Sequence, residues 1–159
     1  LLGVEGQGFA PMQVRLSTPR LQMASWAIGM AQRALDMMLE YAPQRVVFGE
    51  PLANRQAIQW WLADAYTKIK AATLMTYETA WQLDKGADVR TEISAVKAYA
   101  TEMSYELLDH AMQMYGAMGM TKELPLALMQ AQMRTMRIYD GPTEVHKWVV
   151  ARNLLGLKR

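Results

Sequence analysis

Three long segments of this chain repeat apolar residues every three or four positions, and this period limits the possible folds more than any other feature. The clearest repeat lies at Ile93, Val96, Ala100, Met103, Leu107, His110 and Met114. Such spacing places side chains on one face of an α-helix, so each segment predicts a helix with one buried stripe. Residues 23–41 and 58–75 show the same repeat, and no alternating strand pattern of useful length is found.

Glycine and proline residues divide these segments. They cluster at 43–51, 84–88, 116–125 and 140–142, where they favour turns and helix ends. The predicted helices therefore cover residues 18–43, 53–84, 89–115, 125–138 and 142–155. Long helices joined by short connections pack as antiparallel neighbours. The predicted fold is all-α, an up-and-down four-helix bundle with an additional short C-terminal helix.

Composition excludes several classes of protein. The chain has 159 residues, of which 52% are hydrophobic and 20% are charged, and this length and composition predict one folded domain. No apolar run approaches the roughly 20 residues of a membrane helix. The net charge of +2 is dispersed, so no nucleic-acid surface is predicted. The absence of cysteine excludes disulfides and thiolate metal sites. Because the chain begins Leu-Leu-Gly with no signal-like segment, we expect it to be part of a longer polypeptide.

The segment Arg137–His146, RIYDGPTEVH, is the one place where the sequence suggests chemistry. Asp140 stands immediately before Gly141 and Pro142, which end one predicted helix and begin the next. The carboxylate has a simpler interpretation as a helix cap, because Asp accepts hydrogen bonds from free amides and Pro favours the first helical turn. On these residues alone, capping is favoured over catalysis.

Three other patterns carry less weight. Gly3–Phe9 has the glycine spacing of a phosphate-binding loop, but no strand precedes it, so we interpret it as a lead-in loop. His110 lies on a helical seam and is interpreted as a core histidine. Asp140, Glu144 and His146 are separated by four and two residues, which does not place three ligands on one helical face. No metal site is predicted.

Six segments in order, spread over the whole chain, resemble the carboxy-terminal helical domain of the acyl-CoA dehydrogenase family. They read LLGVEGQGF, PRLQMASWAIGMAQRALDMMLEYAPQR, FGEPLANRQ, EISAVKAYATE, QMYGAMGM and IYDGPTEVHKWVVARNLL. The resemblance implies an FAD-dependent oxidoreductase that carries out α,β-dehydrogenation of an acyl-CoA thioester. It also implies that residues 1–17 lead in from a middle domain absent from this chain, and that residues 18–159 form the bundle domain.

The resemblance assigns roles to particular positions. Asp140 falls at the catalytic base, which removes the α-proton of the thioester. Substrate contacts are implied for Arg20, Tyr139 and Gly141. FAD contacts, some of them to the cofactor of a neighbouring subunit, are implied for Arg45, Phe48, Arg55, Gln56, Gln113, Gly116, Thr143 and Glu144. A guanidinium suits phosphate groups and an aromatic ring can lie against a flavin or adenine. Without the resemblance, Arg45 is simply a cation near a helix C-terminus.

The chain departs from the family pattern at the residues nearest the implied chemistry. Most members carry Glu where Asp140 stands and Thr where Pro142 stands, and the family's usual second glycine after Gly116 is Ala117 here. One branch places its Glu at the start of the first long helix, but that position is Pro19. The string Asp-Gly-Pro-x-Glu-Val-His resembles a subgroup that uses Asp as the base, and we expect this chain to belong to it.

Further expectations follow from the resemblance. The implied partners are an acyl-CoA substrate, a second copy of the chain in a dimer or tetramer, and an electron acceptor such as an electron-transfer flavoprotein. The implied location is the cytoplasm in a bacterium, or mitochondria or peroxisomes in a eukaryote. Alone, the chain is expected to be inactive and to bind FAD weakly or not at all. The alternatives are a catalytically degraded bundle for oligomerisation or scaffolding, and a helical protein without flavin.

The chain's fourteen methionines fall mostly on the predicted seams, which favours core packing. The exceptions could line a subunit interface or an acyl pocket: Met118, Met120, Met129, Met133 and Met136.

Overall fold

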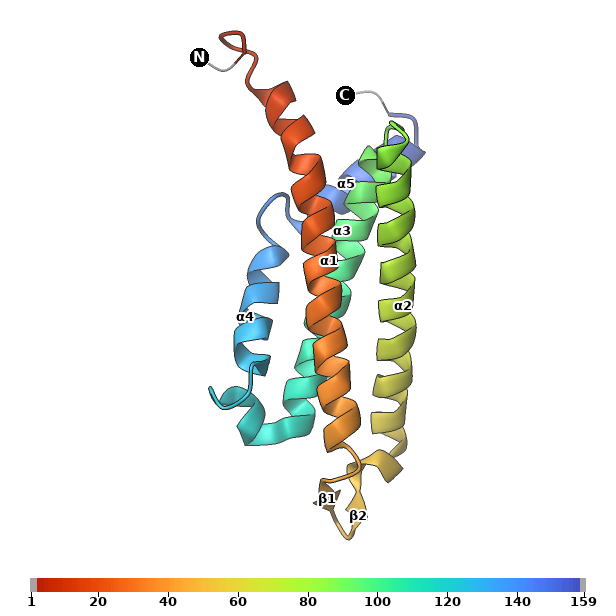
Figure 1. The fold of residues 1–159 in the computed structure, drawn as a ribbon, viewed down its shortest axis with the longest axis vertical. Helices are drawn as coiled ribbons and strands as arrows, with labels where there is room; N and C mark the ends of the chain where they lie inside the picture. Colours follow the sequence, from red (N-terminus) through yellow and green to blue (C-terminus); the bar gives the residue numbers. More distant parts are fainter. Residues whose placement is uncertain (1–2, 158–159) are drawn as a thin grey trace.

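The computed structural model describes residues 3–157, without the side chains of residues 10, 13 and 14. The elements are α1 (Phe9–Tyr41), β1 (Val46–Val47), β2 (Glu50–Pro51), η1 (Leu52–Asn54), α2 (Gln56–Asp84), α3 (Arg90–Tyr115), η2 (Gly116–Met120), α4 (Leu126–Met136) and α5 (Thr143–Leu154). The all-α prediction is confirmed: each of the long helices α1, α2 and α3 runs antiparallel to the next in the chain, α4 completes the bundle, and α5 is the additional short helix (Figure 1). The outer limits of the predicted segments, residues 1–2 and 158–159, lie outside the described residues.

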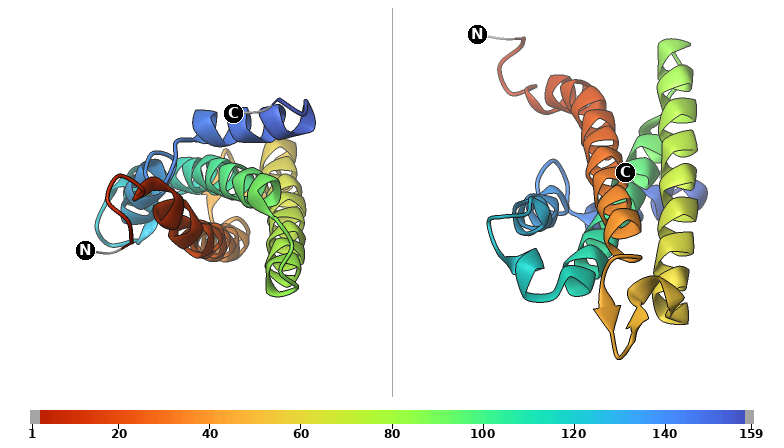
Figure 2. Two further views of the ribbon diagram at one scale, coloured as in Figure 1. Left: turned by 90° about the horizontal axis from the view of Figure 1, so that it is seen from above. Right: turned by 60° about the horizontal axis from the view of Figure 1, so that its bottom comes forward.

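Helix α3 is the centre of the molecule. It packs against α1, α2, α4 and α5, and the view from above shows α1 and α5 on opposite sides of it (Figure 2). Its predicted seam is buried from Ile93 to Met114, apart from half-buried His110. That ring stacks on Trp61 of α2 with centroids 4.4 Å apart. The period of three and four therefore identified the core correctly.

Helix α1 begins at Phe9, nine residues before the predicted start at residue 18. The prediction of a loop up to residue 17 is therefore wrong from Phe9 onward. Pro11 lies in the first turn of the helix, where a backbone N–H has no helical partner, so the missing donor costs nothing there. Pro19 lies inside the helix and removes one backbone hydrogen bond without ending it.

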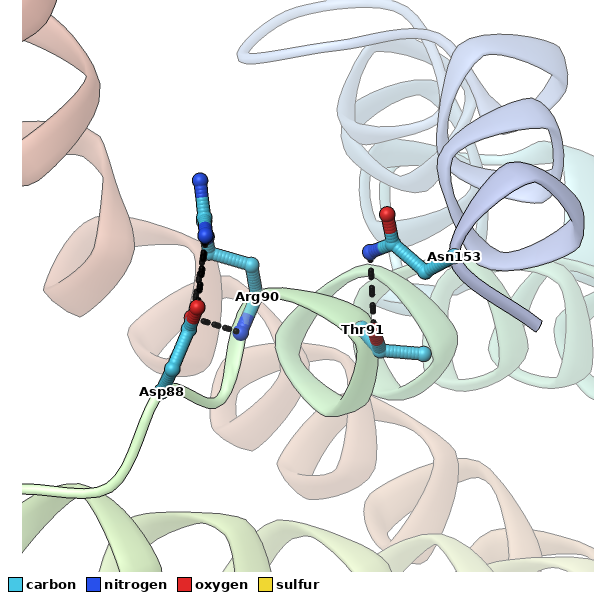
Figure 3. A network of polar contacts seen from close by, with 4 residues as sticks. All are labelled: Asp88, Arg90, Thr91 and Asn153. Atoms are coloured by element: carbon cyan, nitrogen blue, oxygen red, sulfur yellow. Dashed lines mark hydrogen bonds and ion pairs between the residues drawn. The ribbon is translucent and has the colours of Figure 1, made fainter. Parts of the chain in front are cut away.

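Hydrogen bonds fix the direction of α5 against α3. Near the end of α5, Asn153 Nδ2 donates to Thr91 Oγ1 at 2.8 Å, beside an ion pair of Arg90 with Asp88 (Figure 3). At the start of α5, Thr143 Oγ1 donates to Glu102 at 2.7 Å. Helix α5 therefore runs antiparallel to α3, and its first residues lie beside the middle of α3.

A two-residue hairpin joins α1 to α2. Val47 pairs with Glu50, and Phe48 and Gly49 form the turn with φ values of 52° and 80°. Positive φ at both central residues is the pattern of a type I′ turn. No strand was predicted here from the sequence, because strands of two residues are too short to show alternation.

The methionines divide into two groups. Met129, Met133 and Met136 are buried in the core, whereas Met118 and Met120 are 51% and 69% exposed. A subunit interface through the buried group is therefore excluded. Within residues 3–157, no helix is long and apolar enough to cross a membrane.

Candidate functional site

The turn between α4 and α5 holds Asp140 in an unusual backbone conformation. Asp140 has φ 53° and Gly141 has φ 108°, so two consecutive residues lie at positive φ. Asp is one of the few side chains that tolerate this region, and Gly has no β-carbon to strain. A β-carbon on Gly141 would lie 2.7 Å from Nε2 of His146. Residue 141 is thus restricted to glycine by both its backbone and its neighbour.

Three side chains donate hydrogen bonds to the two carbonyls of this turn. Arg20 Nε of α1 reaches the Asp140 oxygen at 2.9 Å, and His146 Nε2 of α5 lies 3.3 Å from the same atom. Lys97 Nζ of α3 donates to the Gly141 oxygen at 2.6 Å. The turn is therefore held by its backbone from three helices.

The Asp140 carboxylate itself accepts no hydrogen bond within the described part of the chain, and the residue is half-buried. Its oxygens are consequently available to a group outside this chain. A half-buried carboxylate on a fixed backbone can accept a proton from a bound ligand.

Two of the three basic residues that contact the turn, Lys97 and His146, are fully buried. Burial lowers the pKa of Lys97 to about 8, against the opposing attraction of the Asp140 carboxylate. Burial, together with the charges of Lys97 and Arg20, lowers the pKa of His146 to about 4. His146 is therefore neutral at pH 7. Its Nε2 carries the proton because the Asp140 carbonyl can only accept, and its buried Nδ1 has no partner in the described structure.

Glu102 of α3 ties the two ends of the turn together. It accepts hydrogen bonds from Arg137 Nε at 2.8 Å and from Thr143 Oγ1 at 2.7 Å. Burial alone would raise the pKa of Glu102, but these hydrogen bonds outweigh it and lower the pKa. The backbone N–H of Thr143 also donates to the Arg137 carbonyl at 3.2 Å, which closes the turn.

The remaining residues implied around Asp140 lie in two settings. Tyr139 is 42% exposed, and burial of its hydroxyl with the nearby Asp140 charge raises the pKa of this group. Glu144 is exposed in the first turn of α5. Thr143 is buried and its hydroxyl donates to Glu102. The structure therefore brings Arg20, Tyr139, Gly141, Thr143 and Glu144 together around Asp140.

A second group of implied residues lies at the hairpin. Phe48 is 97% exposed at its tip, and Arg45 is exposed where the chain leaves α1. Arg55 donates to the Val47 carbonyl at 3.0 Å, and its guanidinium lies 3.9 Å from the Glu50 carboxylate. Gln56 is exposed at the start of α2. Arg55 thus braces the hairpin, while Phe48 and Arg45 face outward.

Gln113 and Gly116 lie at the same end of the bundle as the hairpin. Both are exposed, and Gly116 ends α3 with φ 61°. The ends of α1 and α3 meet there, because Tyr41 and Tyr115 stack with centroids 4.0 Å apart.

The chain does not bring its two groups of implied residues together. Arg20 precedes Tyr41 by 21 positions along α1, which at 1.5 Å per residue is about 30 Å. Asp140 and the hairpin therefore lie in different parts of the bundle.

Lys97 and Glu102 were missed by the sequence analysis. A signal was present, since Lys97, Thr101 and Ser104 repeat at helical spacing within an apolar seam and all three are fully buried. Polar residues at core positions need partners, which makes them candidates for functional support. No group of three or more His, Asp or Glu residues suited to a metal ion is found within residues 3–157.

The protein is a helical bundle whose α4–α5 turn carries a half-buried carboxylate on a fixed backbone, and comparison with known proteins identifies its family. The family described as Acyl-CoA dehydrogenase, C-terminal domain, matches residues 6–155. (R)-benzylsuccinyl-CoA dehydrogenase from Thauera aromatica is 36% identical over 156 residues, covering 98% of this chain and 38% of that protein.

Two solved structures extend the comparison. Butyryl-CoA dehydrogenase from Megasphaera elsdenii superposes with a TM-score of 0.90 at 33% identity, covering 96% of this chain and 40% of that one. The FAD complex of PigA superposes with a TM-score of 0.90 at 28% identity, covering 98% and 40%.

The chain belongs to the acyl-CoA dehydrogenase C-terminal domain family, which confirms the resemblance found in the sequence. It spans about two-fifths of the length of the relatives it matches.

Proposed function

We propose that this chain is the C-terminal domain of an FAD-dependent acyl-CoA dehydrogenase and that Asp140 is the base of α,β-dehydrogenation. The observation that carries the proposal is the Asp140 turn, in which three donors hold the backbone while the carboxylate accepts no hydrogen bond within the described chain. A base must be fixed in position yet free to take a proton. The turn meets both requirements.

The reaction removes two hydrogens from adjacent carbons of the acyl thioester. Asp140 takes the α-carbon's hydrogen as a proton, the β-carbon's hydrogen leaves as hydride, and a carbon–carbon double bond forms. FAD, when bound, supplies the acceptor for that hydride. We further propose that Arg20, Tyr139 and Gly141 border the thioester. These residues adjoin the carboxylate in sequence or through the Arg20 hydrogen bond to the Asp140 carbonyl.

The residues of the hairpin end fit a flavin nucleotide. Phe48 exposes 97% of its surface, which leaves an aromatic face available for a planar ring system. The exposed guanidinium of Arg45 suits a pyrophosphate, because it offers donors in a fixed fork. Gln56 and Gln113, both exposed at this end, supply amide groups to the same cofactor, and Gly116 allows close approach of the backbone. Arg55 supports these contacts by bracing the hairpin.

We infer that a second copy of the chain completes the site. The hairpin lies about 30 Å along the bundle from the Asp140 turn, so the hairpin of one subunit contacts the FAD that serves another subunit's Asp140. We propose that Thr143 and Glu144, both in the first turn of α5, contact the FAD of their own subunit. Reduced flavin then passes its electrons to a separate acceptor, for which an electron-transfer flavoprotein is our candidate.

We also propose that the chain belongs to the subgroup in which Asp replaces the usual Glu. Asp tolerates the positive φ of residue 140 better than Glu does, because its short polar side chain bonds locally. The bundle without the other domains of the protein is expected to be inactive. Recovery of the 159-residue chain as a stoichiometric yellow complex would contradict this expectation.

The test is Asp140→Asn in the full-length protein. Asn keeps the size and the tolerance of positive φ but cannot accept the proton. We expect acyl-CoA to leave the bound flavin oxidised in this variant, followed by flavin absorbance, with FAD content unchanged. Asp109→Asn, an exposed acid of α3 far from the turn in sequence, is the matched control and should behave as wild type. Unchanged flavin reduction in Asp140→Asn would remove Asp140 as the base and favour the alternative of a degraded scaffolding bundle.

A further inference from the structure

We propose that Lys97 is a positioning residue for the base: its buried ammonium holds the Gly141 carbonyl and thereby fixes the direction of the Asp140 side chain. The inference rests on the proposed function of Asp140. It assigns to a core lysine a role in the rate of proton removal rather than in the stability of the bundle.

The backbone of the turn is conformationally flexible by itself. Gly141 sits at φ 108°, a region that only glycine enters easily, and glycine moves between many conformations at little cost. Asp140 is also at positive φ, which costs a residue with a β-carbon about 1–2 kcal/mol. The local sequence therefore does not hold this conformation, and contacts from outside the turn must do so.

The contacts that hold the turn reach two different carbonyls. Arg20 and His146 both reach the Asp140 carbonyl, whereas Lys97 alone among the described residues reaches the Gly141 carbonyl, at 2.6 Å. Fixing one carbonyl leaves the next peptide free to rotate. The Asp140 carbonyl belongs to the peptide that joins residues 140 and 141, and the Gly141 carbonyl belongs to the next peptide, so fixing both carbonyls holds the two peptide planes that flank Gly141. The flexible Gly141 then cannot rotate, and the turn that carries the Asp140 side chain keeps one direction.

A purely structural role does not account for a lysine at position 97. Its side chain is fully buried in α3, where an apolar residue of the same length would fill the space without the cost of desolvating a charge. The hydrogen bond to Gly141 is the only one recorded for its ammonium within the described chain, although the group has three donors. The cost of burying this charge is best explained if the ammonium positions the turn that carries Asp140 for proton removal.

The charge should make the site sensitive to pH. Lys97 is faced by Asp140 of the turn, Arg20 of α1, Glu102 of α3, and Glu144 and His146 of α5. Burial lowers the pKa of Lys97 to about 8, so the ammonium loses its proton within the range of an assay. Loss of the charge weakens the hydrogen bond to Gly141, because bonds to charged donors are roughly twice as strong as neutral ones.

The experiment compares Lys97→Met and Lys97→Arg in the full-length, FAD-loaded protein, with the rate of flavin reduction by acyl-CoA measured in single turnovers from pH 6 to 10. We expect Lys97→Met to lower this rate about a hundredfold, the effect of misplacing a reacting group by about 1 Å, with a much smaller change in KM. In the wild-type protein, we expect the rate to fall at alkaline pH as Lys97 loses its proton. This alkaline fall should be absent in Lys97→Met. It should move to higher pH in Lys97→Arg, because a guanidinium stays protonated.

Lys68→Met is the matched control, since it removes an ammonium from a solvent-exposed pair with Glu106, and it should leave the rate unchanged. If Lys97→Met does not retain FAD, Lys97→Gln replaces it, and disappearance of the alkaline fall remains the criterion. A Met or Gln variant with the wild-type rate and pH profile would overturn the role of Lys97. Asp140→Asn, measured in the same assay, separates the two hypotheses. If it abolishes flavin reduction, a wild-type result for the Lys97 variants contradicts only the role of Lys97. If Asp140→Asn remains active, the proposed function itself is wrong.

Discussion

Replacing Gly141 by Ala tests whether the turn is fixed by both its backbone and its contact with α5. The new β-carbon would sit at φ 108° and 2.7 Å from His146 Nε2, with Cε1 and Cδ2 of the same ring at 3.2 and 3.3 Å. Strain at such a backbone position costs about 1–3 kcal/mol, and displacing the ring sacrifices a hydrogen bond of about 1 kcal/mol. We expect a loss of roughly 2–4 kcal/mol in the free energy of unfolding.

The assay is thermal and urea unfolding of the 159-residue chain, followed by circular dichroism. A loss of this size lowers Tm by about 5–15 °C in a domain of this length. Gly29→Ala is the matched control, because Gly29 lies inside α1 with open space around it. The same substitution there should stabilise the chain by about 0.5–1 kcal/mol.

A double-mutant cycle separates the contact from the backbone strain. In Gly141→Ala combined with His146→Ala, the ring is gone and the new β-carbon meets nothing where Nε2 stood. The double variant should therefore be more stable than the sum of the two single losses predicts, by at least about 1 kcal/mol. Losses that add to within about 0.5 kcal/mol would refute the contact, and a Gly141→Ala chain as stable as wild type would refute the whole reasoning.

Two further predictions concern the ring of His146 and the tip of the hairpin. Because burial lowers the pKa of His146 from 6.5 to about 4, the unfolded chain binds more protons in this interval; stability should fall by on the order of 3 kcal/mol as the pH drops from 6.5 through 4. Urea unfolding at pH 7 and pH 4 should show this loss, and His146→Gln should reduce it, whereas an equal loss in both chains would contradict the assignment. Phe48→Ala should leave unfolding of the chain unchanged, because the ring is 97% exposed, but lower the FAD content of the full-length protein after gel filtration; an unaltered FAD content would show that the ring does not serve the cofactor.

The helices were predictable because their ends are marked locally. Helix α2 ends at Asp84 and α3 ends at Tyr115, as expected from the glycines that follow, and Gly116 takes the positive φ that stops α3. Helix α1 was the exception. The predicted start at residue 18 placed Pro19 in the first turn of the helix, yet α1 begins at Phe9, so Pro19 lies inside the helix and removes one backbone hydrogen bond without ending it. Between Phe9 and Thr18, the described side chains are exposed or half-buried, so they form no buried apolar stripe that a sequence pattern could reveal.

From the residues alone, the candidate site was predictable only at Asp140; the family resemblance added Arg20 and the neighbours of Asp140 in sequence, and neither predicted Lys97. Asp140 stands out in sequence because Gly141 and Pro142 follow it, but its supports come from distant positions: Arg20 is 120 residues away and Lys97 is 44 residues from Gly141. Their contacts go to backbone carbonyls, so the side chains of residues 140 and 141 do not reveal which distant residues are their partners. The same limit applies to the FAD residues, since motif matching orders them along the chain but does not reveal that the hairpin and the Asp140 turn lie far apart.

The positive φ of Asp140 governs how substitutions at this position can be interpreted. Asp and Asn share a tolerance for that conformation, so exchanging them changes charge alone. Extending the acid by one methylene would change both the length of the side chain and its tolerance of positive φ. A changed rate could then not be assigned to either cause alone. Redesign of the acid's length therefore has to be carried out together with redesign of the peptide that bears it, and Asp140→Glu in isolation would be an ambiguous experiment whatever its outcome.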